Sequence, residues 1–178
     1  MKQLFLQLFA ITVIFSSCSS SDSDSGDNED SQNPTAEIIG TWNGVDVEYS
    51  GTSTFTILGE NVVSTFIGEA YDVDFTLIFT ENPNNVVADG SYSLNLTVTT
   101  LGEVQTETVE NLELLDSGTW IISGSTLSIT AEGETTEVTI MELTETSLIL
   151  RIIEEENYVE NGLEISAEIE ALVTLSRN

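Results

Sequence analysis

The sequence predicts an all-β domain after residue 36, built as an antiparallel meander. Thr, Val, Ile and Leu dominate this region, apolar and polar residues alternate in many short runs, and Gly, Asn and Pro recur between the runs. No segment after Ala36 keeps the apolar period of 3.6 residues that an amphipathic helix would show. We count about ten candidate strands joined by tight turns, a pattern that a β-sandwich satisfies as well as a barrel does.

The candidate strands follow one another along the chain with turns between them. After a first strand that begins near 39–42, they cover 73–79, 92–98, 104–112, 119–122, 127–129, 138–140, 148–153 and 163–175. The turn at 82–85 contains Pro83, which fixes φ, between asparagines that tolerate positive φ. Residues 148–153 are almost continuously apolar, which predicts a strand covered on both faces. In the last strand every odd-numbered residue is apolar, and only Leu172 interrupts the polar face.

Residues 1–17 have the composition of a signal peptide. Lys2 is the only positive charge ahead of an apolar run at 4–15, which is too short to span a bilayer as a mature helix. Two serines precede Cys18, and this stretch resembles the lipobox of bacterial lipoproteins, with Phe15 where that motif usually has Leu, Val or Ile. The resemblance implies cleavage before Cys18 and lipidation of its sulfur, which would anchor the protein in a membrane. Because Cys18 is the only cysteine, an intramolecular disulfide is excluded.

An acidic, low-complexity segment follows the cysteine. It resembles the export tag of some Gram-negative lipoproteins, which implies display on the outer face of the outer membrane; its residues are Ser19, Ser20, Ser21, Asp22, Ser23 and Asp24. A calcium loop through the aspartates of this region is disfavoured, because Gly26 falls where the third ligand should be and no Glu closes the loop. We expect a lipidated flexible tether over 18–36, spanning roughly 25 Å, and one domain over 37–178.

Charge and composition exclude several classes of function. The chain has 31 acidic residues, three basic residues and a net charge of −28, which becomes −29 when Lys2 leaves with the leader. A surface this negative repels phosphate backbones and anionic membranes, so we expect no nucleic-acid partner. The absence of histidine removes the Ser-His and Cys-His nucleophile pairs and the usual zinc ligand, and the absence of lysine after the leader removes Schiff-base chemistry. We therefore expect no enzymatic activity, no metal site and no cofactor.

Three short motifs carry a resemblance to a known family. Ile39-Gly40-Thr41-Trp42 resembles the Gly-x-Trp signature of lipocalins, and residues 118–129 and 143–150 are similar to segments that recur in small lipocalin-like lipoproteins. The resemblance extends over roughly 37–178. It implies an antiparallel up-and-down β-barrel of about 8–10 strands, and it favours this lipocalin-like barrel over the sandwich.

The resemblance also implies how the barrel is closed. In the lipocalin pattern the signature tryptophan closes the barrel floor and an arginine from near the chain end packs across its ring. Gly40, Trp42 and Arg177 are therefore the expected closure residues, since Arg177 continues the inward row of the last strand. Arg151 is the alternative partner of the tryptophan, although it lies on the opposite face from its apolar neighbours.

A glycine near the signature is a candidate site for a β-bulge. We expect a bulge at Gly44 because it would turn the residues on either side of it to the same inner face. The residues expected on that face are Trp42, Val45, Val47 and Tyr49.

Large inward side chains are the candidate lining of a binding pocket. A barrel of this size either fills with side chains or keeps a small cavity, so the same residues are also candidates for a plain core. The candidate pocket-lining residues are Phe75, Leu77, Phe79, Tyr92, Leu94 and Leu96. The run Glu154-Glu155-Glu156, with Glu160 beside the turn at 161–162, lacks the spacing of a calcium site, and we interpret it as a solvated charge run.

These observations predict a lipid-anchored, surface-exposed outer-membrane protein with a non-catalytic lipocalin-like barrel. Its partners would be the membrane, through the lipid on Cys18, and a small hydrophobic ligand. One alternative is a structural or protein-interaction module whose barrel is packed solid and whose protein partner is unknown. Another is a glycan-binding module, for which Trp120 and Tyr158 are the plausible exposed aromatic residues.

Overall fold

Nine antiparallel strands form a single sheet in the part of the chain that the structure describes. The computed structural model describes residues 37–160 and 162–177, and no helix among these residues is long and apolar enough to cross a membrane. The strands are β1 Gly40–Ile57, β2 Glu60–Thr80, β3 Asn85–Thr100, β4 Glu103–Leu112, β5 Gly118–Ser123, β6 Thr126–Ala131, β7 Glu134–Leu143, β8 Ser147–Glu160 and β9 Leu163–Ser176. The predicted all-β antiparallel fold is confirmed.

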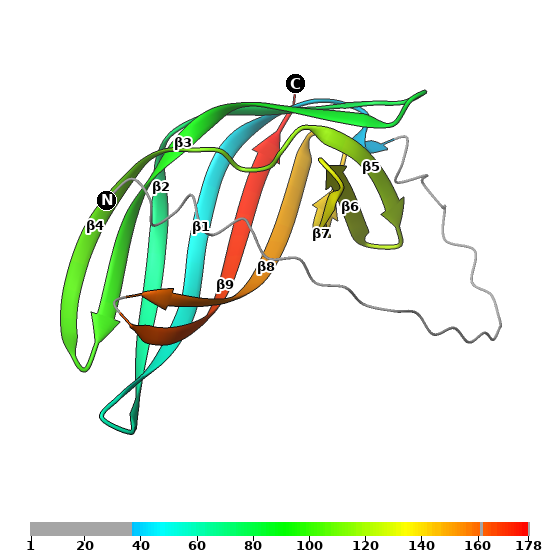
Figure 1. Cartoon of the computed structure of the whole chain (residues 1–178). Helices are drawn as coiled ribbons and strands as arrows, with labels where there is room; N and C mark the ends of the chain where they lie inside the picture. Colours follow the sequence, from blue (N-terminus) through cyan, green and yellow to red (C-terminus); the bar gives the residue numbers. More distant parts are fainter. Residues whose placement is uncertain (1–36, 161, 178) are drawn as a thin grey trace, which may run out of the picture.

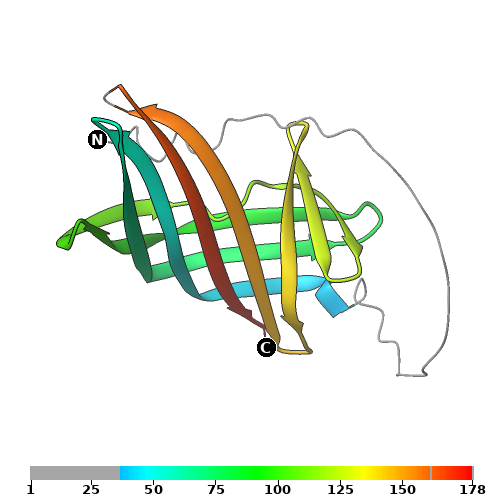
Figure 2. The same ribbon diagram turned by 90° about the horizontal axis from the view of Figure 1, so that it is seen from below.

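The sheet closes on itself into a barrel. Its strand order is β2-β1-β9-β8-β7-β6-β5-β3-β4, and β2 also pairs with β3, the next-to-last strand of this order, which closes the ring. Figures 1 and 2 show the strands wrapping around a common interior. This near-closed ring confirms the lipocalin-like up-and-down barrel, and it rules out the sandwich that the strand pattern alone allowed.

The ring is held weakly at one seam, next to β4. Strand β3 pairs with β5 through two residues only, Asn85 and Val86, and its pairing with β4 covers residues 92–100. Residues 113–117 join β4 to β5 across the barrel (Figure 1), and the hydroxyl of Ser117 bonds both the N–H and the carbonyl of Ala88 on β3 at 2.9 and 3.3 Å. This linker therefore replaces strand pairing where β4 and β5 diverge.

The hydrophobic core fills one end of the barrel, where β1 and β3 begin and β2 and β9 end. The largest fully buried side chains there include Ile38, Trp42, Leu77, Phe79, Trp120, Leu127, Leu148 and Leu175. Burial of one such side chain contributes about 1.5–3 kcal/mol, so this end carries much of the stability. The hairpins β1–β2, β3–β4 and β8–β9 turn at the opposite end. The barrel thus has a packed end and an end bounded by hairpin turns.

The predicted bulge near Gly44 is present, but its effect on one residue differs from the prediction. The pairing of β1 with β9 shifts register between Gly44 and Asp46, so the inward row passes from Trp42 to Val47. Val45 is 53% exposed, which corrects its predicted inward position, because it lies inside the bulge. Glycine is required at position 44 since a Cβ there would lie 2.5 Å from the ring of Phe75 on β2.

Strand β8 is buried on one face only, in contrast to the prediction for residues 148–153. Leu148, Leu150 and Ile152 point into the barrel and are buried, whereas Ile153 is 46% exposed. The barrel has a single sheet layer, and no helix among residues 37–160 and 162–177 covers β8 from outside, so the outward aliphatic residues remain at the surface.

Candidate functional site

The closure residues meet at the packed end of the barrel. The guanidinium carbon of Arg177 lies 4.3 Å from the centroid of the Trp42 ring, and Trp42 is fully buried. The indole N–H of Trp42 donates a hydrogen bond to the carbonyl of Ile38 at 2.7 Å. A Cβ at Gly40, whose φ is +131°, would lie 3.3 Å from Nη1 of Arg177. The structure therefore brings Gly40, Trp42 and Arg177 together.

The guanidinium of Arg177 also bonds two backbone carbonyls. Its Nη1 donates to Ile39 at 2.7 Å and its Nε donates to Glu145 at 2.7 Å. Arg151 lies elsewhere, on the outer face of β8, where it makes a two-bond ion pair with Glu170 of β9 at 2.8 and 3.1 Å. Arg177, and not Arg151, is thus the arginine that packs against Trp42.

The other half of the barrel contains a cavity of about 420 Å³. Its wall is largely apolar and comes from β1, β2, β3, β4, β7, β8 and β9 together with the linker at 113–117. The apolar lining residues are Phe66, Leu94, Leu96, Val98, Leu112, Leu114, Leu115, Ile152, Ala167, Ile169 and Ala171. The barrel is therefore not packed solid, and the hollow half is the candidate binding site.

The structure divides the six predicted pocket-lining residues between the cavity and the core. Tyr92, Leu94 and Leu96 on β3 line the cavity. The other three belong to the core and do not line this cavity: Phe75, Leu77 and Phe79 on β2. They lie on the last part of β2, which pairs with the start of β1 at the packed end of the barrel.

Small side chains on β9 were not among the predicted pocket residues, although they create much of the space. Ala167 and Ala171 are buried and face the cavity, where larger residues would fill it. The sequence did indicate them: among the odd-numbered, inward-facing residues of the last strand, only these two are alanine, and the others are larger. Tyr49 on β1 and Phe66 on β2 complete the wall.

Two tyrosines lie at the boundary between core and cavity. The hydroxyls of Tyr49 and Tyr92 are 2.6 Å apart and share a hydrogen bond, and their rings stack with centroids 6.4 Å apart. Burial raises the pKa of both phenols, and the charge of Glu154 raises them further. Phe75 packs its ring against Tyr92 at 5.9 Å between centroids. Both tyrosines therefore stay neutral near pH 7, and both line the cavity.

Two glutamates of β8 also face the cavity, which corrects their interpretation as part of a solvated run. Glu154 and Glu156 continue the inward row of Ile152 and are half-buried, whereas Glu155 between them is exposed. Burial raises the pKa of the Glu154 carboxyl. Burial, and then repulsion by Glu154, raises the pKa of Glu156 to about 7. The charge of this part of the wall therefore changes near neutral pH, as Glu156 gains or loses its proton.

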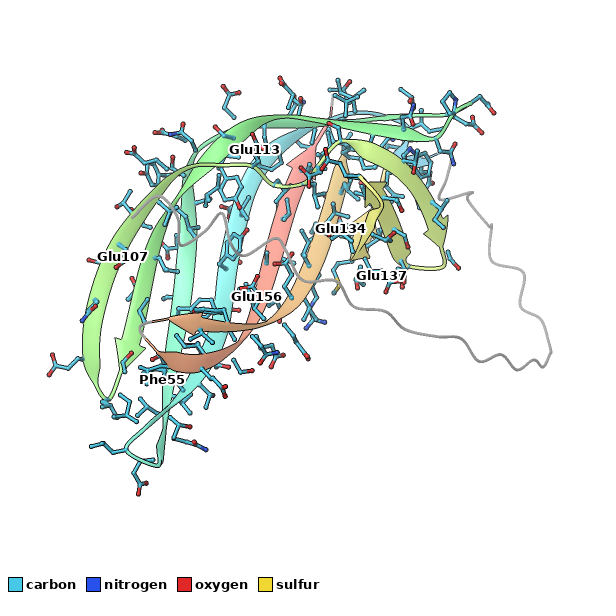
Figure 3. All side chains as sticks on the ribbon, viewed as in Figure 1. Phe55, Glu107, Glu113, Glu134, Glu137 and Glu156 are labelled. Atoms are coloured by element: carbon cyan, nitrogen blue, oxygen red, sulfur yellow. The ribbon has the colours of Figure 1, made fainter. Side chains whose placement is uncertain are left out.

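Acidic residues from two other elements line the same cavity. Glu107 comes from β4, and Glu113 and Asp116 come from the linker; Figure 3 labels Glu107, Glu113 and Glu156 on the ribbon. No lysine or arginine occurs among the described residues that line it. The described part of the chain also contains no group of three side chains suited to holding a metal ion. The arrangement suits non-covalent binding in an apolar, negatively charged chamber.

A family model for the lipocalin-like domain matches residues 38–150. The chain belongs to the lipocalin-like family. A search of curated proteins found no match. The matched residues include the Trp42 signature and end within β8, and the structure places the remaining residues of β8 and all of β9 in the same lipocalin-like barrel.

The lipocalin-like barrel does not expose Trp120 as a glycan-binding surface would require. Trp120 is 1% exposed, and its indole N–H donates to the carbonyls of Thr80 and Asn85, both at 3.1 Å. Its ring packs edge-on against Phe79 with 5.8 Å between centroids. Trp120 is therefore a core residue of the seam between β3 and β5, and its predicted exposure is corrected.

The predicted anchor and export residues fall in the first 36 residues of the chain. Cys18 and the segment from Ser19 to Asp24 lie outside the residues that the structure describes. Their roles stay predictions from the sequence.

Proposed function

We propose that this lipocalin-like domain is a non-catalytic binding protein that takes up a small, largely apolar molecule. The observation that carries the proposal is the cavity of about 420 Å³ in one half of the barrel. This volume falls in the range of about 300–1,000 Å³ that small-molecule sites usually have. A barrel packed solid, as a structural module would be, would leave no such space.

The shape of the wall favours an apolar body for the ligand. Leucine, isoleucine and valine side chains of β3, β8 and β9 would remove the ligand's apolar surface from water at about 25 cal/mol per Å². The packed end below the tyrosine pair is rigid, because Trp42, Arg177 and the core hold it. Ligand binding therefore needs no rearrangement of the core, and entry is expected from the half bounded by the hairpin turns.

We also propose that the protein is a lipid-anchored component of the outer membrane, facing the exterior. The support is the lipobox-like sequence ending at Cys18 and the acidic segment that follows it. A tether over 18–36 would hold the barrel clear of the lipid headgroups while keeping it close to the membrane surface.

The binding function is tested by filling the cavity. N-phenyl-1-naphthylamine is a neutral apolar fluorophore whose emission rises when it leaves water, and it should bind the purified protein saturably. Ala167→Phe places a large ring in the cavity and should abolish this binding, whereas Ser166→Phe, on the outward face of the same strand, should leave it intact. Failure of the parent protein to bind the probe, or equal binding by the Ala167→Phe variant, would reject the cavity as the site.

A further inference from the structure

The inner face of β8 changes character halfway along the barrel. Its inward row holds Leu148, Leu150 and Ile152 and then switches to Glu154 and Glu156 at the level of the cavity. Burying a carboxylate against apolar side chains is unfavourable, and an aliphatic residue would be more stable at either position. The two acids are therefore better explained by what enters the cavity than by the folding of the barrel.

No protein cation offsets these acids from within the described wall of the cavity. Arg151 is on the outer face of the same strand and pairs with Glu170, and Arg177 is held at the packed end by Trp42 and two carbonyls. Glu107, Glu113 and Asp116 add further negative charge from β4 and the linker, where their side chains are exposed. The half-buried Glu154 and Glu156 lie in a partly desolvated space, where the field of a carboxylate is stronger than on an open surface, so they would attract a positive group and repel a negative one.

Aromatic rings supply a second, independent preference for a cation. Tyr49, Phe66, Tyr92 and Tyr158 come from four different strands, β1, β2, β3 and β8, and all line this cavity. The faces of such rings attract ammonium groups, and combined aromatic and carboxylate surroundings are a general solution for binding amines and quaternary ammonium ions. The acids and the rings thus favour the same ligand chemistry.

We propose that the ligand is an amphipathic cation, with an apolar body against the aliphatic wall and an amine or quaternary ammonium group between β8 and the tyrosine pair. This proposal rests on the proposed binding function and specifies the ligand class for the same cavity. It excludes fatty acids and other anionic amphiphiles, whose carboxylates would meet the acids of β8. Glu154 and Glu156 are the residues that distinguish cationic from neutral ligands.

The test compares three ten-carbon probes that differ only in the head group: decylamine, 1-decanol and decanoate. Each is titrated calorimetrically into the purified protein at pH 8, below its micelle concentration. Decylamine should bind at least about tenfold more tightly than 1-decanol, and decanoate should bind least. In the double variant Glu154→Gln/Glu156→Gln the affinity for decylamine should lose most of its excess over that for 1-decanol, and the aromatic rings and the remaining acids account for what is left. The exposed neighbour provides the matched control, because Glu155→Gln should change none of the three affinities.

The outcomes separate this proposal from the proposed function. Binding of 1-decanol by the double variant shows that the barrel is folded and the cavity intact. If the parent binds 1-decanol as tightly as decylamine, the cationic ligand class is overturned while the binding function stands. If the double variant keeps the parent's full preference for decylamine, the assignment of the cationic head group to Glu154 and Glu156 is overturned. If none of the three probes binds the parent, the binding function fails and this proposal fails with it.

Discussion

The guanidinium carbon of Arg177, which follows the last strand, lies 4.3 Å from the centroid of the Trp42 ring on the first strand. The same group bonds the carbonyls of Ile39 and Glu145. It therefore joins the start of β1, the loop between β7 and β8, and the end of β9. A cation over an indole contributes about 0.5–2 kcal/mol, more when water is excluded.

The first prediction concerns the stability of this contact. Trp42→Ala removes a fully buried aromatic side chain and should cost about 3–5 kcal/mol in the free energy of unfolding. Against a typical stability of roughly 5–15 kcal/mol, that loss should leave a domain that melts early or fails to fold. Arg177→Ala should cost less, and the two losses should be non-additive because each residue's contribution depends on the other.

A double-mutant cycle from denaturant unfolding measures this coupling, with Arg151 as its control. The Arg151–Glu170 pair is on the barrel surface, so Arg151→Ala should cost no more than about 1 kcal/mol and should add independently to Trp42→Ala. Additive losses for Trp42 and Arg177 would contradict the coupling, and a Trp42→Ala protein as stable as the parent would contradict the role of the tryptophan in closing the barrel.

Much of this end of the barrel was readable in the sequence. The strict alternation of β9 fixed which of its residues point inward, and Arg177 follows that row into the packed end. The change of parity after Gly44 in β1 was also predicted, and only Val45 was misplaced, because it lies inside the bulge and is exposed. The sequence pattern did not predict the hairpin formed by the end of β1 and the start of β2. In these two segments Thr and Ser occur together with apolar residues on both faces, so no alternation is visible.

The cavity was harder to predict, since an inward row looks the same whether it is packed or hollow. Phe75 and Leu94 both point inward, yet Phe75 belongs to the core and Leu94 also lines the cavity. The difference comes from partners distant in sequence, above all the alanines of β9. The positions of Glu154 and Glu156 were predicted wrongly for a related reason. A run of charged residues is usually solvated, and Glu154 and Glu156 face the interior only because the strands close into a barrel.

The second prediction concerns two exposed leucines at hairpin turns. Leu58 and Leu101 each have a positive φ, 53° and 52°, and each precedes a glycine with a positive φ. Two-residue turns of this geometry favour Asn-Gly, because asparagine tolerates the left-handed region better than leucine does. Leu58 is 100% exposed and makes no packing contribution that would be lost. Leu58→Asn should therefore raise the free energy of unfolding by about 0.5–1 kcal/mol.

Denaturant unfolding of three variants tests the turn argument. Leu101→Asn should give a gain of the same sign as Leu58→Asn, since the two turns share their geometry. Leu58→Ala is the control and should give no comparable gain, because alanine has the same difficulty as leucine at positive φ. An equal gain from alanine and asparagine would show that removing the exposed side chain, and not the backbone conformation, is what matters.

The third prediction concerns the proposed membrane anchor. Cys18→Ala should remove the acyl group and release the protein from the outer membrane, as measured by metabolic labelling with an alkyne fatty acid. Asp22→Ala combined with Asp24→Ala should keep the lipid but lose cleavage by protease added to whole cells. Label retained by the Cys18→Ala protein would refute lipidation at this sulfur. Unchanged cleavage of the double variant would show that the acidic segment is only a tether.

The last prediction uses the titration of Glu156. Its pKa is about 7 in the folded protein, against an ordinary value of 4.5, because burial and the charge of Glu154 disfavour the carboxylate. The other titratable groups lining the cavity around it are Tyr49 on β1, Tyr92 on β3, Glu107 on β4, Glu113 and Asp116 in the linker, and Glu154 and Tyr158 on β8. None of these carries a positive charge, so none favours the ionised form of Glu156.

The sign of the effect follows from proton binding. Between about pH 4.5 and pH 7 the folded state holds a proton on Glu156 that the unfolded state has released. The stabilisation from this proton is complete below the unfolded pKa and is lost as the pH rises through 7. At pH 8 the parent therefore carries an unfavourable buried charge, and Glu156→Gln should be more stable than the parent there. Water reaches this half-open cavity, so we expect a gain of about 1 kcal/mol, well below what the full pKa shift would imply.

Unfolding by urea at pH 8 and pH 5 measures the effect against a matched variant. The advantage of Glu156→Gln should be present at pH 8 and should shrink at pH 5, where the folded parent has already protonated this carboxyl. Glu155→Gln, on the exposed face of the same strand, should differ from the parent by a similar small amount at both pH values. If Glu156→Gln is no more stable than the parent at pH 8, or if its advantage is independent of pH, then Glu156 ionises as a solvated group and the cavity wall is not desolvated at that position.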